Sequence, residues 1–132
     1  MDIKEKIEYW LDLAEYDIDV AKSLLNSKKF LYVGFFCHLI IEKTLKAYYW
    51  YSLKSDPPFT HNLLLLANKS NLLKEMSEDM ILFLNKLMPL NIEGRYPIDK
   101  QLLIQQLDET RITEILSTTL NVHKWLKELI KY

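Results

Sequence analysis

Four polar side chains stand out in the most apolar segment of the chain, LYVGFFCHLIIEKTLKAYYWYSL, residues 31–53. They are His38, Glu42, Lys46 and Tyr49, at spacings of four, four and three. On a helix this spacing places all four on one face about 80° wide. Burying such groups is costly unless they are paired. Two interpretations follow: Glu42 and Lys46 satisfy each other as an i,i+4 pair, or the face forms the polar rim of a ligand pocket.

These residue types offer weak support for metal binding or nucleophilic catalysis. His38 and Glu42 could share a cation with His61 as a third ligand, but no recognised metal-binding spacing is present. The single cysteine, Cys37, falls on an apolar helix face, where a thiol behaves as a small hydrophobe. The two glycines are too far apart in the sequence to form a phosphate-binding loop. We therefore predict no catalytic residue, no metal and no cofactor.

The composition is that of one globular domain, which we place at residues 1–132. Hydrophobic residues make up 49% of the chain, and 17 basic against 18 acidic residues leave a formal charge of −1. This near-neutral balance lacks the excess of positive charge that is typical of proteins that bind double-stranded nucleic acid. The first residues, MDIKEKIEYW, alternate in charge, and the sequence has no apolar run of about 18 residues that could span a membrane. We expect a cytoplasmic protein with no membrane association.

Hydrophobic periodicity predicts an all-α fold. Long helices are expected near Asp2–Ser27, Leu31–Leu53 and Asp108–Lys131, the middle one being apolar almost all round and therefore central. Two shorter helices are expected between the second and third of these, with Thr60 and Ser77 as their N-caps. The matched lengths of the three long helices favour side-by-side packing in an up-and-down bundle.

Three local features carry further expectations. Gly34 lies inside the central helix, where it costs stability unless it lets a neighbouring helix approach closely. The stretch that ends at Gln106 is poorly patterned and is expected to be a loop or a short helix. His123 sits beside Trp125 on the last helix and is expected to be a surface or packing residue.

The order of four segments resembles the HEPN domain, a family of small helical proteins found beside minimal nucleotidyltransferases. The segments are AEYDIDVAKSLL, FFCHLIIEKTLKAYY, PPFTHNLLLLA and GRYP, followed by the last amphipathic helix. The similarity runs from about Ile7 to Ile130. The resemblance implies a bundle of four to five helices, a dimer, and a link to nucleotides or RNA. The ligand-binding positions that it implies are Glu42, Lys43, Lys46, His61, Arg95 and Tyr96.

Arg95 lies in the one loop that contains both a glycine and a proline, NIEGRYP, residues 91–97. Gly94 permits an unusual turn and Pro97 stiffens the exit, so Arg95 can be held out as a planar, permanently charged fork. Alternatively, Arg95 pairs with a carboxylate such as Glu42 or Glu93 and pins the loop to the bundle. The sequence leaves both roles open.

The chain departs from the family's ribonucleases at their catalytic motif. Those members carry an arginine and a histidine with four to six residues between them. The corresponding window after Arg95 contains Lys100, Gln101 and Leu102, and the window after Arg111 contains Leu116, Ser117 and Thr118. Neither contains histidine, so the paired group needed for RNA cleavage is missing.

Our leading interpretation is therefore a non-enzymatic HEPN protein. It would bind a nucleotide or RNA, pair with a minimal nucleotidyltransferase, or do both, as half of a toxin–antitoxin-like pair. One alternative is an endoribonuclease with a different set of catalytic residues, such as His61 and Arg95. Another is a purely structural dimer. The aromatic content, 3 Trp, 8 Tyr and 5 Phe, includes the run YYWY and is more than a small bundle readily buries. It predicts a homodimer with two-fold symmetry.

Overall fold

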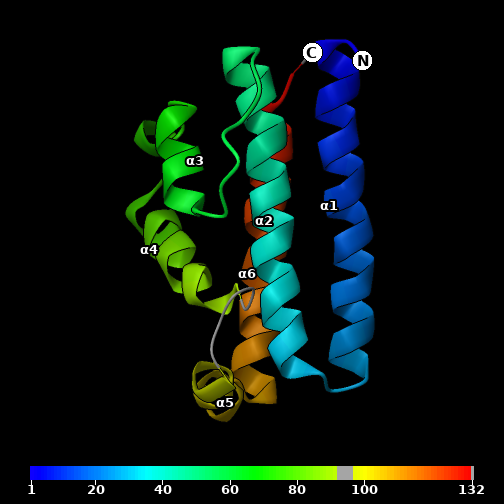
Figure 1. Ribbon diagram of the computed structural model, residues 1–132, viewed down its shortest axis with the longest axis vertical. Coiled ribbons are helices and arrows are strands. Elements are labelled where there is room, and N and C mark those ends of the chain that lie inside the picture. Colours follow the sequence, from blue (N-terminus) through cyan, green and yellow to red (C-terminus); the bar gives the residue numbers. More distant parts are fainter. Residues whose placement is uncertain (92–96, 132) are drawn as a thin grey trace.

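The computed structural model describes residues 1–91 and 97–131 and shows six α-helices in that part of the chain (Figure 1). The long helices are α1 (Ile3–Asn26), α2 (Phe30–Leu53) and α6 (Glu109–Leu129). The shorter ones are α3 (Leu63–Lys69), α4 (Glu78–Leu87) and α5 (Pro97–Gln106), with 3₁₀ turns η1 (Leu73–Glu75) and η2 (Met88–Leu90). The described residues contain no strand. The all-α prediction is confirmed, and the helices number six where four to five were expected.

The four main helices alternate in direction along the bundle. In Figure 1, α1 runs down, α2 up, α4 down and α6 up, so the N- and C-terminal ends lie together at one end of the molecule. α2 packs against α1 on one side and α3 on the other, with α6 behind it. This is the up-and-down arrangement that the matched helix lengths predicted. The poorly patterned stretch before Gln106 is α5, which begins at Pro97, a residue that suits the first helical position.

Local capping explains where most helices begin. Asp2 forms a capping box with Glu5, and the side chains of Ser77 and Asp108 accept hydrogen bonds from the backbone N–H groups of Met80 and Arg111. The prediction of Thr60 as the cap of α3 was wrong, because that helix begins two residues later than the Thr60 cap implied. Its cap is Asn62, whose side chain accepts from Leu65 N at 3.0 Å.

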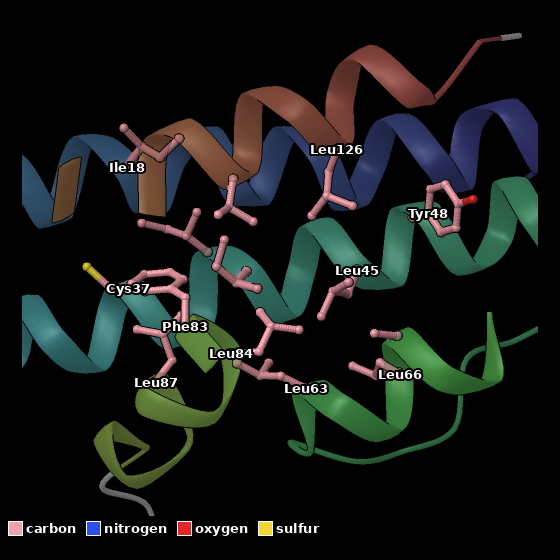
Figure 2. Close-up of a cluster of buried hydrophobic side chains, with 14 of the residues drawn as sticks. Ile18, Cys37, Leu45, Tyr48, Leu63, Leu66, Phe83, Leu84, Leu87 and Leu126 are labelled. Carbon is pink, nitrogen blue, oxygen red and sulfur yellow. The ribbon is translucent and has the colours of Figure 1, made fainter. Parts of the chain in front are cut away.

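The core surrounds α2, which is buried on nearly every side (Figure 2). Cys37, Ile40, Ile41 and Leu45 are at most 1% exposed and pack against side chains from α1, α3, α4 and α6. Gly34 permits the close approach that was predicted. A Cβ added there would lie 3.3 Å from Leu90 Cδ1 and 3.4 Å from Ile112 Cδ1. The central, most buried position of α2 is therefore confirmed, and the polar groups on α2 can be held rigidly.

A chain of polar contacts joins α1, α2 and α6 behind the core. Thr44 Oγ1 lies 2.8 Å from His123 Nδ1, and His123 Nε2 lies 3.0 Å from Glu15 Oε1, which also accepts from Lys127 Nζ at 2.7 Å. Burial lowers the pKa of His123, although the nearby Glu15 carboxylate acts in the opposite direction. The hydrogen bond from Lys127 lowers the pKa of Glu15. His123 is therefore a buried linking residue between helices.

Candidate functional site

The carboxylate of Glu42 is the centre of a polar cluster on α2. Glu42 is 4% exposed, and its Oε2 accepts a hydrogen bond from Lys46 Nζ at 3.1 Å. Its Oε1 lies 2.9 Å from His61 Nδ1 and 3.6 Å from His38 Nδ1. A buried carboxylate is tolerated when such donors surround it. Glu42 therefore pairs with Lys46, as one interpretation of the sequence predicted. It also contacts His61, a histidine from outside the helix.

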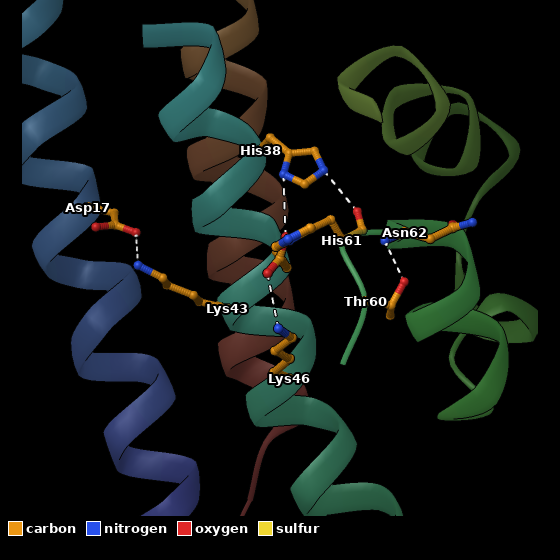
Figure 3. A network of polar contacts seen from close by, with 8 residues as sticks. Asp17, His38, Lys43, Lys46, Thr60, His61 and Asn62 are labelled. Carbon is orange, nitrogen blue, oxygen red and sulfur yellow. Dashed lines mark hydrogen bonds and ion pairs between the residues drawn. The ribbon is translucent and has the colours of Figure 1, made fainter. Parts of the chain in front are cut away.

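His61 reaches Glu42 from the loop that joins α2 to α3, residues 54–62. The loop is fixed to α2 at a second point, because His38 Nε2 lies 3.0 Å from the backbone carbonyl oxygen of His61 (Figure 3). Thr60 Oγ1 accepts from the backbone N–H of Asn62 at 3.1 Å and tightens the turn before α3. The His61 imidazole is thus placed by three neighbouring contacts, yet its side chain remains 45% exposed. A fixed, half-exposed imidazole can meet a ligand.

Lys46 connects this cluster to a groove rich in aromatic side chains. Its Nζ lies 5.2 Å from the centroid of the Trp10 ring on α1, while Lys6 Nζ lies 4.2 Å from the centroid of the Trp50 ring. The groove has a volume of about 220 Å³ and is lined by Trp10, Lys46, Trp50, Asp56, Pro57, Pro58 and Phe59. Aromatic surface therefore occurs between α1, α2 and the 54–62 loop together with one cation, Lys46, and one carboxylate, Asp56.

Phe59 is the most exposed large apolar side chain of the described residues, at 99%. It follows Pro57 and Pro58, which stiffen the loop, and its ring centroid lies 6.4 Å from that of His61. Leaving an aromatic ring fully in water forgoes the stabilisation that burial of its surface would give. This position is therefore suited to covering a ligand or a partner.

The structure brings together only part of the predicted residue set. Glu42, Lys46 and His61 lie in one cluster, whereas Lys43 points toward α1 (Figure 3). There its Nζ donates to Asp17 Oδ2 at 2.6 Å, and Asp17 is itself 6% exposed. Lys43 thus joins α1 to α2 and lies away from the His61 side of the helix. The predicted ligand-binding residues Arg95 and Tyr96 lie outside the described residues.

Metal binding and thiol chemistry receive no support in the described part of the chain. Across residues 1–91 and 97–131, no three His, Cys, Asp or Glu side chains are arranged to hold a metal ion. His38, Glu42 and His61 were considered as metal ligands from the sequence alone. In the structure, both histidines contact the Glu42 carboxylate directly. Burial raises the pKa of Cys37 to about 12, which keeps its thiol protonated and unreactive.

Comparison with known proteins settles the family. The family model of the HEPN domain matches residues 7–129, nearly the whole chain. The chain belongs to the HEPN family. No curated protein and no solved structure gives a significant match to this HEPN protein. No helix in the described residues is both long enough and apolar enough to cross a membrane. The resemblance read from the ordered segments is therefore confirmed.

Sequence reasoning missed the aromatic members of this HEPN site. Trp10 and Trp50 are on different helices, and no spacing rule connects them across the bundle. The sequence did contain a signal for Phe59. It directly follows two prolines, which prevent helix formation, so this aromatic residue is expected in a loop. The cluster places a cation and an imidazole near aromatic rings, residue types that suit an anionic, aromatic molecule, and its His61–Glu42 contact is also the kind that orients a general base.

Proposed function

We propose that this HEPN protein is a non-enzymatic nucleotide-binding module that uses the groove beside Lys46 and His61. The observation that carries the proposal is the position of Lys46, which contacts Glu42 on one side and the ring of Trp10 on the other. Nucleotides combine an anionic phosphate with a flat aromatic base. Lysine and histidine suit the phosphate, and aromatic side chains suit the base.

The dimensions and lining of the groove support a base as the bound group. Its volume of about 220 Å³ is small, and its walls include two tryptophans, two prolines and the exposed Phe59. A flat ring can stack in such a space, whereas a bulkier apolar group has less room. Stacking on Phe59 also removes from water a ring that is otherwise 99% exposed. Arg95 and Tyr96 would complete the site with a second fixed cation and a further ring.

Ligand-dependent thermal unfolding tests this proposal. A nucleotide at about 100 times its Kd stabilises the folded state by about 2.7 kcal/mol, which raises Tm by several degrees. ATP, GTP and a short RNA are the ligands to compare. Phe59→Ser should remove most of the shift, whereas Tyr16→Ser, which changes another exposed aromatic residue at 72% exposure on α1, should leave it intact. Absence of a shift with all three ligands would contradict the proposal.

The role of Arg95 needs its own variant. Arg95→Ala should abolish the ligand-induced shift if the guanidinium holds phosphate. If Arg95 instead pins its loop to the bundle, the same variant should lower Tm without ligand, because an unpaired buried carboxylate is left behind. Arg95→Lys is the matched control, since it keeps the charge but loses the two-pronged geometry.

We also propose that the protein is a two-fold homodimer that pairs with a minimal nucleotidyltransferase in a toxin–antitoxin-like system. The YYWY run supports the dimer less than expected, because Tyr48, Tyr49 and Trp50 are at most 9% exposed within one chain. Exposed apolar residues outside the aromatic groove that favour an interface include Tyr9, Tyr32, Leu102 and Ile104. Light scattering at tens of micromolar should give a dimer mass; a monomer mass would refute this part.

Endoribonuclease activity is the second candidate, and one contact favours it. His61 Nδ1 lies 2.9 Å from Glu42 Oε1, so a carboxylate orients the imidazole as it does in many general bases. Arg95 would stabilise the developing phosphorane charge. The absence of the family's arginine–histidine motif weighs against this candidate, and the cleavage assay described in the Discussion separates the two.

A further inference from the structure

A second groove lies between α4, α5 and α6 and shares no lining residue with the aromatic groove at the 54–62 loop. It consists of two adjoining hollows of about 330 and 250 Å³. Lys86, Arg111 and Ile115 line both hollows and therefore mark where they meet. The larger volume reaches the lower end of the range found for small-molecule sites.

The two hollows differ in their chemistry. The larger one has an aliphatic lining made of Pro89, Leu90, Leu103, Leu107 and Ile115. Leu90, Leu107 and Ile115 are at most 6% exposed and belong to the hydrophobic core, so this wall is firmly packed. The smaller hollow adds Phe83, Glu114 and Thr118 to the two cations. The groove thus has an apolar end and a polar end.

Lys86 and Arg111 stand on opposite walls, one on α4 and the other on α6. Within residues 1–91 and 97–131, neither side chain lies within 4.0 Å of a carboxylate oxygen. One Arg111 nitrogen, Nη1, lies 3.3 Å from the carbonyl oxygen of Gln106, which turns the guanidinium toward the end of α5. Two exposed cations at the border of an apolar hollow, neither paired with a described carboxylate, form a place for a negative group that carries an apolar tail.

We propose that this groove is a binding site for a small amphiphilic carboxylate, with its acyl chain in the aliphatic hollow and its carboxylate between Lys86 and Arg111. The described residues that line the larger hollow include no aromatic side chain on which a base could stack, and Phe83 in the smaller hollow is 9% exposed, so this lining favours an acyl chain over a nucleotide. Arginine can bind a carboxylate through two parallel hydrogen bonds. Glu114, which lines the polar hollow, repels the bound carboxylate and sets an upper limit on affinity.

Straight-chain carboxylates test the apolar half of the site in the 132-residue chain. Each buried methylene should tighten binding about fourfold, so octanoate should bind about fifteen times more tightly than hexanoate. NMR titration should move the methyl signals of Leu103 and Ile115, while the indole N–H signals of Trp10 and Trp50 stay in place. This readout separates the site from the nucleotide groove, so either proposal can fail without the other. Equal affinities for the two acids would overturn the inference.

Charge variants test the polar half. Lys86→Gln should weaken octanoate binding about tenfold and leave 1-octanol binding unchanged, because only the acid uses the cation. Glu114→Gln should tighten octanoate binding by removing a repulsive charge. Lys74→Gln, which alters an exposed lysine that does not line the groove, is the control. If Lys86→Gln and Lys74→Gln behave alike, or if Glu114→Gln weakens binding, the carboxylate position proposed here is wrong.

Discussion

His61 Nδ1 lies 2.9 Å from Glu42 Oε1, and this contact fastens the 54–62 loop to the central helix. The same carboxylate holds Lys46, so one buried charge organises two of the groups proposed to meet a nucleotide. The loop in turn carries Phe59, which is placed beside the groove through this attachment. The His61–Glu42 contact therefore serves both the loop conformation and the proposed site.

The buried Glu42–Lys46 pair should behave as a coupled unit. Glu42→Gln should lower the free energy of unfolding by about 3 kcal/mol, because Lys46 is left 7% exposed without its countercharge. Lys46→Met should also lower the free energy of unfolding, because the buried Glu42 carboxylate then loses its positively charged hydrogen-bond donor. In the double variant, the loss of unfolding free energy should be smaller than the sum of the two single-variant losses by at least about 1 kcal/mol. Urea unfolding can measure this difference. Strict additivity would show that the two charges do not depend on each other.

Stability should fall as the pH is lowered below about 6.5, partly through His123. Burial lowers the folded-state pKa of His123 below its unfolded value, so the unfolded chain binds the proton more readily. Its contribution is therefore fully present above the unfolded pKa and is lost as the pH falls through the folded pKa. The lowered pKa of Glu15 acts in the same direction at lower pH.

His123→Gln isolates the histidine contribution to this pH dependence. The loss of unfolding free energy between pH 7 and pH 5 should become smaller in this variant than in the native protein. His61→Gln is a useful comparison, because that imidazole is half exposed and belongs to a different cluster. A pH dependence that is unchanged by His123→Gln would contradict the assignment.

Cys37 should resist thiol reagents while the protein is folded. The side chain is fully buried, and its pKa is raised to about 12, so the thiolate is scarce at pH 8. Labelling with a disulfide reagent should be slow in buffer and immediate in denaturant. Rapid labelling in buffer would mean that α2 opens locally far more often than its packing suggests.

The purified protein should not cleave RNA above background, because the arginine–histidine motif is missing from both arginine windows. Cleavage that is lost in His61→Ala, with folding intact by circular dichroism, would instead establish the endoribonuclease candidate. His38 and His123 are both buried, so Lys74→Gln, which changes an exposed residue that does not line the aromatic groove, is the control.

The helices could be predicted from sequence because their signals are local. Asp2, Ser77 and Asp108 have side chains that cap a helix wherever it lies in a fold. The error at Thr60 arose because Thr60 and Asn62 both suit a cap. Which of the two residues caps α3 depends on the contact between His61 and Glu42, residues distant in the sequence, because this contact fixes where the loop ends.

Side-chain partners between helices were harder to predict. Asp17 lies on the buried stripe of α1, between Ala14, Ile18 and Ala21, and a carboxylate there signals a cation on a neighbouring helix. That signal could have assigned Lys43 to α1 and away from the ligand-binding set. No comparable signal showed that Trp10 and Trp50 line the same groove, because this depends on the packing of α1 against α2.

The central claim is that a nucleotide binds in the aromatic groove, and the three tryptophans of the chain provide the most direct test. Trp10 and Trp50 line the groove, whereas Trp125 on α6 does not. ATP titrated into ¹⁵N-labelled protein should shift the indole N–H signals of Trp10 and Trp50 saturably and leave that of Trp125 in place. No shift, or equal shifts of all three signals, would contradict the account.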